Sequence, residues 1–287
     1  MSRAARRMSR AKGHVGQPPV GGGYSKTPDQ ISGLHLWLKA DSLTGLTNGD
    51  VVSTWNDLSG NNFHATASGT RRPTYQTNAS ATGLPGLKLN GAQGMLSAAL
   101  SGKPEQTVIA VFKLDTAAQN YVNTIRGGGF KSLQLRIDGT TPRAVSAIYD
   151  GVGAPTISAP LDQVATFSYT YSQSGSNSMF RIDNTESQPV GGTMDLIDTQ
   201  TTYIGMLDDG SDAFHGVLYE IAVWNRVLTL DELDAVIFAL GAKWQNLPDP
   251  SAVLPQAPTV NPIGRYTTAT PVVAGSAKIH EYVNVTV

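Results

Sequence analysis

The stretch FHGVLYEIAVWNRVLTLDELDAVIFALGAKW, at residues 214–244, joins a strand pattern directly to a helix pattern. Residues 216–224 are almost continuously apolar and predict a β-strand. Thr229 and Glu232 then form a capping box, in which each side chain satisfies a backbone N–H of the first helical turn. Apolar residues follow at helical spacing, at Leu230, Leu233, Val236, Ile237, Leu240 and Trp244. Pro248 ends the pattern, so we expect a short amphipathic helix that packs against one end or face of a sheet.

The region before this stretch repeats the strand pattern, in short alternating or apolar segments separated by turn residues. Such segments occupy residues 33–39, 107–113, 132–137, 144–149, 164–171, 179–183 and 202–205. Pairs such as Asp138-Gly139 are typical of tight turns between antiparallel strands. Helical patterns do not alternate with the strands, so a parallel sheet is not expected. The sequence therefore predicts an all-β antiparallel fold with one short C-terminal helix.

The composition agrees with such a fold. Of the 287 residues, 40% are hydrophobic, which allows a sizeable core, and 15% are charged. The 30 glycines suit a fold of many short strands and turns. The absence of cysteine excludes disulfides, thiolate metal sites and thiol nucleophiles. No apolar stretch approaches the roughly 20 residues of a membrane helix, so no membrane partner is expected.

The N-terminal residues 1–23 combine a basic arm with a Gly/Pro-rich linker. The arm contains Arg3, Arg6, Arg7, Arg10 and Lys12 and no acid. Because the net charge of the chain is −1, an arm of +5 leaves the remainder at −6. We expect a flexible docking arm that binds an acidic protein surface, with the phosphates of nucleic acid as the alternative partner. A solvated terminus and a mitochondrial presequence are the other interpretations; no apolar secretory segment is present.

The C-terminal residues 249–287 form a Pro-rich extended tail that ends in a strand pattern, KIHEYVNVTV, at residues 278–287. A strand at the edge of a sheet exposes backbone groups that require partners. The terminal strand therefore either closes the home sheet or adds to the sheet of a neighbouring molecule. The long lead-in favours the second alternative.

Two blocks of sequence carry a family resemblance. The first contains LHLWLKAD at residues 34–41, VSTWNDLSGNN at 52–62 and LPGLKLNG at 84–91, and the second is the strand and helix at 214–244. Together they resemble the concanavalin A-like lectin/glucanase superfamily, in particular the laminin-G-like domains common in bacterial surface and phage virion proteins. The resemblance implies one antiparallel jelly-roll sandwich over residues 24–248.

Three tryptophans and one glutamate of these blocks are interpreted as residues of the protein interior. Trp37, Trp55 and Trp224 lie in or beside alternating strands, and we expect them in the core. A sugar-stacking surface is the alternative if one of them is exposed in a groove. Glu220 lies in an apolar strand, where a buried carboxylate requires a partner. Arg226, at the end of the strand, is the expected partner.

The sequence lacks the residues of a hydrolase. A retaining glucanase needs two carboxylates about 5–5.5 Å apart, which in laminarinase-type relatives come from Glu-x-Asp-x-x-Glu on one strand. The nearest pattern is Glu232 with Asp234, but Ile237 replaces the second glutamate and the segment is predicted to be helical. No Gly-x-Ser-x-Gly elbow and no phosphate-binding Gly-Lys-Ser/Thr loop occurs. We therefore expect a protein that is not an enzyme.

Calcium is the one ion that the resemblance implies, at a rim of loops. Ca²⁺ takes roughly 6–8 oxygen ligands. Asp208, Asp209 and Asp212 form an acidic loop before the second block, and Asp57 with Asn61 is the weaker candidate. Ordinary solvated turns have the same composition, so both interpretations stay open.

These features combine into a functional hypothesis. We expect a structural and binding protein of a bacteriophage virion, as a capsid decoration, head-fibre or tail-associated component. The lectin-like domain would face outward, where it could bind a cell-surface glycan. The basic arm and the C-terminal strand would contact other virion proteins in a homo-oligomer or larger assembly. The alternative is a carbohydrate-binding module of a secreted or surface protein, and a glycoside hydrolase is the third interpretation.

Overall fold

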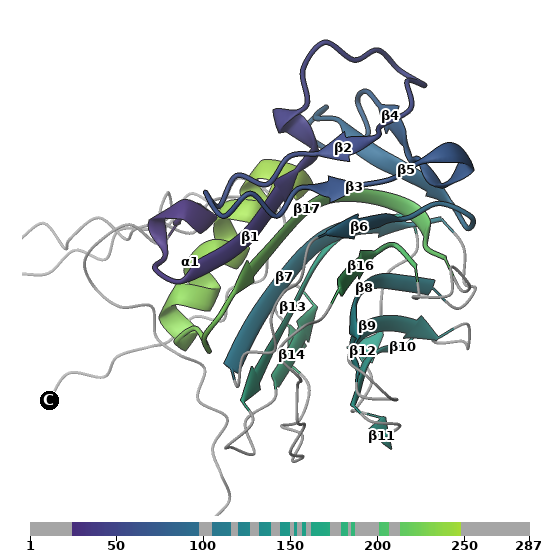
Figure 1. Cartoon of the computed structure of the whole chain (residues 1–287). Helices are drawn as coiled ribbons and strands as arrows, with labels where there is room; N and C mark the ends of the chain where they lie inside the picture. Colours follow the sequence, from purple (N-terminus) through teal and green to yellow (C-terminus); the bar gives the residue numbers. More distant parts are fainter. Residues whose placement is uncertain are drawn as a thin grey trace, which may run out of the picture.

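The strands of the protein form two antiparallel sheets packed face to face (Figure 1). The computed structural model describes residues 25–97, 105–115, 120–126, 132–138, 144–149, 152–153, 157–158, 162–172, 179–182, 185–186, 201–206 and 213–247. Every pairing between the described strands is antiparallel. The predicted all-β sandwich with one short helix is confirmed.

Sheet A contains eight of the described strands in the order β15-β14-β13-β7-β17-β5-β4, and β1 pairs with the end of β17 that β5 leaves free. The strands are β1 (Leu34–Lys39), β4 (Thr74–Gln76), β5 (Gly86–Asn90), β7 (Glu105–Leu114), β13 (Val164–Ser172), β14 (Met179–Ile182), β15 (Thr185–Glu186) and β17 (His215–Trp224). The apolar run at residues 216–224 therefore forms the central strand of the sheet, because β17 pairs with β7, β5 and β1.

Sheet B contains nine of the described strands in the order β11-β10-β9-β8-β16-β6-β3-β2, with β12 paired to β10. The strands are β2 (Thr54–Trp55), β3 (Ala65–Thr66), β6 (Met95–Ser97), β8 (Asn120–Arg126), β9 (Ser132–Asp138), β10 (Ala144–Tyr149), β11 (Val152–Gly153), β12 (Ile157–Ser158) and β16 (Thr201–Ile204). Several of these strands have only two or three residues, which is too short to show a period in the sequence.

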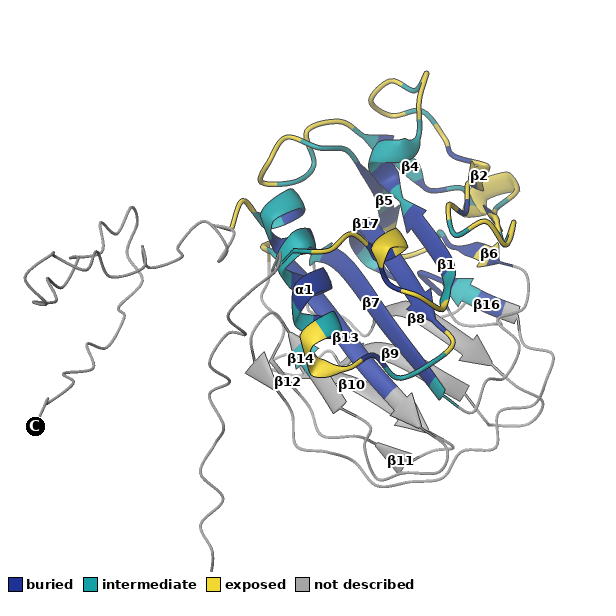
Figure 2. Ribbon diagram, turned by 90° about the vertical axis from the view of Figure 1, so that its left-hand side faces the viewer, coloured by how far each residue is buried: buried dark blue, intermediate teal, exposed yellow. Residues whose placement is uncertain are grey.

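The predicted helix is α1 (Leu230–Leu240), which lies on the outer face of sheet A, in front of β7 and β13 in Figure 2. Both hydrogen bonds of the predicted capping box are present between Thr229 and Glu232. The predicted apolar stripe is buried from Leu233 onward. Leu230 is the exception: it is 55% exposed, because the buried stripe begins one turn later.

The helix continues beyond α1 as a π-helical turn, η4 (Gly241–Gln245). It ends at Asn246, whose φ of 57° is left-handed, two residues before Pro248. Three short 3-10 turns complete the regular structure: η1 (Pro28–Gln30), η2 (Ala40–Ser42) and η3 (Gly69–Arg71). No helix of the described residues is long and apolar enough to cross a membrane.

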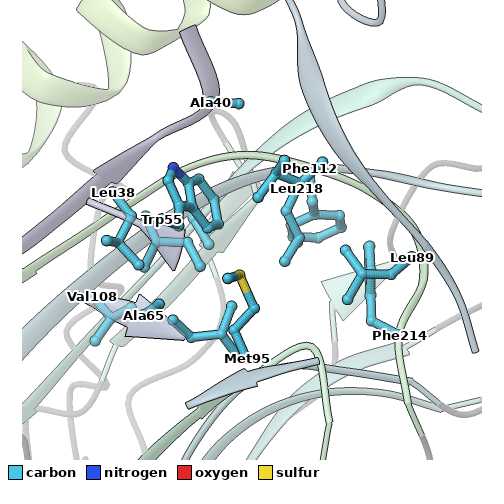
Figure 3. Close-up of a cluster of buried hydrophobic side chains, with 14 of the residues drawn as sticks. Leu38, Ala40, Trp55, Ala65, Leu89, Met95, Val108, Phe112, Phe214 and Leu218 are labelled. Carbon is cyan, nitrogen blue, oxygen red and sulfur yellow. The ribbon is translucent and has the colours of Figure 1, made fainter. Parts of the chain in front are cut away.

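Two hydrophobic cores hold the layers together. The larger core fills the space between the sheets, where Trp55 and Met95 of sheet B meet Phe112 and Leu218 of sheet A (Figure 3). The second core lies between sheet A and the helix and includes Trp224 and Trp244. Each fully buried large apolar side chain contributes roughly 1.5–3 kcal/mol to folding. The prediction that Trp37, Trp55 and Trp224 are core residues is confirmed, since none is more than 9% exposed.

The first and last described residues both lie on the helix side of the domain. The N–H of Lys26, near the first described residue, donates to the carbonyl of Ala235 in α1 at 3.1 Å. Leu247, the last described residue, follows η4 at the end of the same helix. A helix rises 1.5 Å per residue, so the two exits lie on the order of 20 Å apart. The predicted arm (1–23) and tail (249–287) lie outside the described residues, and their boundaries stay predictions.

Candidate functional site

The outer face of sheet B is the open side of the sandwich. The helix covers the outer face of sheet A, and Figure 1 shows α1 and sheet B on opposite sides of sheet A. In the part of the chain that the structure describes, no helix packs on sheet B. Thr54, Thr66 and Leu96 of sheet B are exposed.

Four residues form a row across this face, which we name the open row: Thr54, Thr66, Leu96 and Tyr203. The strand register pairs Thr54 with Thr66, Thr66 with Leu96, and Leu96 with Tyr203. Their sequence neighbours Trp55, Ala65, Met95 and Ile204 all point into the core between the sheets. Side chains alternate along a strand, so the open row faces outward.

The side chains of the open row suit a neutral polar ligand with apolar faces. Leu96 is 39% exposed and Tyr203 is partly exposed, while the two threonines are exposed. The row thus offers an aromatic ring and an aliphatic side chain for contact, and hydroxyl groups that both donate and accept hydrogen bonds. A pyranose or furanose ring presents the same combination of C–H faces and hydroxyl groups. The row contains no charged side chain.

The weaker calcium candidate, Asp57, has a structural role. Its Oδ1 accepts from the N–H groups of Trp37 (2.8 Å) and Ser59 (2.9 Å). Its Oδ2 accepts from the Ser59 hydroxyl (2.8 Å) and the N–H of Phe63 (3.0 Å). The carboxylate is buried, and each oxygen already accepts two hydrogen bonds. This geometry therefore does not fit an oxygen ligand of Ca²⁺.

Residues 57–61, which we name the edge loop, satisfy the free edge of β1. Besides the bond from Trp37 N–H to Asp57, the N–H of Leu58 donates to the carbonyl of Trp37 at 2.8 Å. The Ser59 hydroxyl and the Asn61 amide both donate to the carbonyl of His35 at 3.0 Å. An unpaired strand edge can pair with a strand of another chain, and the edge loop prevents this because it occupies the backbone groups of β1. Asp57 and Asn61 are thus brought together by a shared strand edge.

The other predicted site residues lie elsewhere. Asp208, Asp209 and Asp212, and the basic residues Arg3, Arg6, Arg7, Arg10 and Lys12, are outside the described residues. Within the described ranges, no group of three or more His, Asp or Glu side chains could hold a metal ion. The calcium prediction therefore depends on Asp208, Asp209 and Asp212, which the structure does not describe.

A charged cluster lies beneath the end of the helix, around Glu220. Its Oε1 accepts from the Trp37 indole N–H at 2.6 Å, and its Oε2 accepts from the Trp244 indole N–H at 2.7 Å. Lys243 Nζ donates to the same Oε2 at 2.7 Å and to Asp41 Oδ1 at 3.1 Å. Glu220 is 1% exposed, so its charge is compensated entirely within the protein.

Two backbone irregularities bring these groups together. The register of β17 against β7 shifts between Leu218 and Glu220, which marks a β-bulge at Tyr219. Without the bulge, alternation would turn Glu220 toward the same side as Leu218, into the core between the sheets. On the facing element, the π-helical turn η4 carries Lys243 and Trp244. Bulges and π-turns change the direction of single side chains. Here the bulge turns Glu220 toward the helix, and the π-turn carries the two side chains that contact it.

The prediction that Glu220 pairs with Arg226 is wrong. Arg226 forms a two-pronged ion pair with Glu232 instead, at 2.8 Å from Nη1 to Oε2 and 2.7 Å from Nη2 to Oε1. The spacing along the chain suggested the wrong partner because Arg226 lies past the end of β17, in the connection that leads to α1. The hydrogen bond from Arg226 lowers the pKa of Glu232 to about 2.

The open row was missed by sequence reasoning. Each of its residues lies in a strand of two to four residues, and β16 is more than 100 residues from the other three strands along the chain. Only the pairing of β2, β3, β6 and β16 brings them into one row. Alternation around Leu96, with Met95 and Ser97 as buried neighbours, was the one local signal of an outward side chain.

No protein-family model and no curated protein matches the chain. Among solved structures, the chain is similar to Trypanosoma rangeli sialidase in complex with sialic acid, with 17% identity and a TM-score of 0.52 over 74% of this chain. The chain spans 33% of the length of that sialidase. It is also similar to domain 4 of AbnA, an extracellular arabinanase of Geobacillus stearothermophilus, in complex with arabinotriose.

The match to the arabinanase domain has 15% identity and a TM-score of 0.52, and it covers 70% of this chain and 96% of that domain. At such identities the likeness concerns the fold. The chain therefore has a lectin-like β-sandwich fold, in agreement with the coarse form of the sequence resemblance.

Proposed function

We propose that this protein is a carbohydrate-binding module without a catalytic site, and that the open row of sheet B is its glycan-binding surface. The observation that carries the proposal is the outward register of Thr54, Thr66, Leu96 and Tyr203 on the face opposite the helix. Aromatic and aliphatic contact with a few hydroxyl groups is the usual chemistry of small-molecule sites.

The fold likeness supports a glycan as the ligand. The arabinanase domain, of which this chain covers 96%, was solved with arabinotriose, and the sialidase was solved with sialic acid. Both names describe those proteins and not this one. They nevertheless make an oligosaccharide the first ligand class to test on an exposed sheet face of this composition.

The geometry of the buried acids supports the absence of catalysis. Among the described residues, Asp57 and Glu220 are the buried carboxylates. Asp57 accepts four hydrogen bonds from its own loop and from β1, and Glu220 accepts three. Lys243 lies between Glu220 and Asp41 and forms an ion pair with each of them. A two-carboxylate glycoside hydrolase needs one carboxyl group that is free to donate a proton and one that is free to attack the sugar or to activate water.

A glycan array with the full chain tests the proposal. The array should contain arabinotriose together with neutral and acidic oligosaccharides of several linkages. We expect concentration-dependent binding to at least one class, which the variant Leu96→Ala weakens. Leu230→Ala is the matched control, because it makes the same substitution at another exposed leucine, on the opposite side of the domain. A full chain that is folded and binds none of the glycans would refute the proposal.

A second proposal concerns assembly, and it is favoured by the position of the two exits on the helix side. We infer that the terminal segments anchor the domain to other proteins while sheet B faces away from them. The virion role expected from the sequence is one form of this proposal, and it depends on the composition of residues 1–23 and 249–287. Truncation of either segment should prevent incorporation into particles, and normal incorporation of both truncated chains would refute this proposal.

A further inference from the structure

One end of the open face carries an arginine. Arg71 ends the short turn η3, and its carbonyl accepts from the N–H of Gly94 at 3.0 Å, next to β6. Its Nη1 lies 3.8 Å from the sulfur of Met206, which follows β16. β6 and β16 are the strands that supply Leu96 and Tyr203. The guanidinium group is thus held at the ends of the same two strands.

Arg71 is exposed, and its guanidinium group lies beside the residues that flank the ends of β6 and β16. Met95 points into the core, so Leu96 faces outward, whereas Gly94, just before β6, is buried. A Cβ atom placed on Gly94 would lie 2.6 Å from the sulfur of Met206, which shows that the Met206 side chain covers Gly94 on that side. Gly94 and Leu96 are two residues apart, or about 7 Å along a strand. This distance is comparable to the width of one sugar ring.

Arg71 is an exposed cation without an acidic partner in the described part of the chain. The ion pairs there join other residues: Lys88 and Lys113 with Asp115, Arg181 with Asp234, Arg226 with Glu232, and Lys243 with Asp41 and Glu220. The contact of Arg71 with a thioether leaves its remaining N–H donors to solvent. The neighbouring Arg72, by contrast, donates from Nε to the carbonyl of Gly69 at 3.0 Å.

Resting on the proposed function, we propose that Arg71 binds the carboxylate of an acidic sugar residue whose ring lies on Leu96 and Tyr203. The planar guanidinium group matches a carboxylate with two parallel hydrogen bonds, which a neutral sugar cannot provide. The open row itself is uncharged, so Arg71 supplies the charge complementarity of the face. The preferred ligand is therefore an oligosaccharide that contains a uronic acid or another carboxylated sugar.

Calorimetric titration of the full chain with trigalacturonate and with its methyl ester tests the inference. The two probes have the same rings and hydroxyl groups and differ in the carboxylate charge. We expect the acid to bind at least about tenfold more tightly than the ester, and Arg71→Gln to remove that difference. Arg72→Gln is the matched control, since it removes the same charge from the adjacent residue and should keep the preference. Salt should weaken binding of the acid and not of the ester.

The outcomes separate this inference from the proposed function. Equal affinity for acid and ester, or an unchanged preference in Arg71→Gln, would overturn the role of Arg71 and leave a glycan-binding face intact. Binding of neither probe, nor of any glycan on the array, would overturn both. A loss of thermal stability of several degrees in Arg71→Gln, together with unchanged selectivity, would assign Arg71 an internal partner instead of a ligand.

Discussion

The ammonium group of Lys243 lies 2.7 Å from Oε2 of Glu220 and joins the π-helical turn to the bulge of the central strand β17. Trp244 and Trp37 complete the shell around the same carboxylate. This cluster attaches the helix to sheet A at one end, and the Arg226–Glu232 pair sits at the other end. The helix therefore covers one side of the sandwich firmly and leaves sheet B as the side open to a ligand.

Replacing Lys243 with methionine should destabilise the protein strongly. The variant keeps most of the apolar stem of the side chain and leaves Glu220 buried without a counter-charge, for which a loss of about 3–5 kcal/mol is expected. Urea denaturation measures the free energy of unfolding. Lys39→Met is the control: Lys39 lies over the ring of Trp37 and should contribute less than about 1 kcal/mol. Equal stability of the two variants would contradict the assigned role of Glu220.

Stability should fall in acid through Glu232. The folded-state pKa of Glu232 is about 2, below the ordinary value of 4.5. Its contribution is therefore complete above pH 4.5 and is lost as the pH falls toward 2, by roughly 1–2 kcal/mol for a partly exposed pair. The measurement is the difference between wild type and Glu232→Gln in urea at several pH values. A difference that does not shrink between pH 4.5 and 2 would show that the ion pair contributes nothing.

Replacing Asp57 with asparagine should open the edge of β1. The substituted amide can accept at one oxygen only, and its NH₂ group faces N–H donors, so we expect a loss of about 2–3 kcal/mol. The freed edge should also promote self-association, which light scattering detects. Asp231→Asn, on the exposed first turn of α1, is the matched control and should cost less than about 1 kcal/mol. A folded, monomeric Asp57→Asn protein of wild-type stability would contradict the edge-loop assignment.

The protein should not hydrolyse the glycans that it binds. The two buried carboxylates of the described residues are engaged within the protein, Glu220 with Lys243 and two indole N–H groups and Asp57 with the edge loop and β1. Reducing-end assays with the bound glycan over a day should show no product above the rate without protein. Product formation that tracks protein concentration would refute the absence of catalysis.

The sequence predicted those elements that are long enough to show a regular hydrophobic pattern. The capping box at Thr229, the helix after it and the longer strands such as β7, β13 and β17 follow directly from the pattern. β8 was missed because NYVNTIR mixes polar and apolar residues without alternation. The strands of two or three residues are too short to show an alternating hydrophobic pattern.

The partners within the site depended on contacts that no local pattern encodes. Lys243 is 23 residues from Glu220, and its approach requires both a bulge in β17 and a π-turn in the helix. The spacing in the sequence indicated Arg226 as the partner of Glu220, but Arg226 pairs with Glu232 in the first turn of α1. Leu96 and Tyr203 likewise become neighbours only through strand pairing. The prediction of a lectin-like sandwich could thus be made, whereas its open face could not.

Calorimetry of Tyr203→Ala with the glycan selected on the array tests the central claim most directly. Tyr203 supplies the aromatic ring of the open row, and loss of its contact should weaken binding by at least about tenfold, with thermal stability within a few degrees of wild type. Leu230→Ala, on the helix side, should bind like wild type. Wild-type affinity of Tyr203→Ala, or a loss of affinity in Leu230→Ala alone, would contradict a binding surface on sheet B.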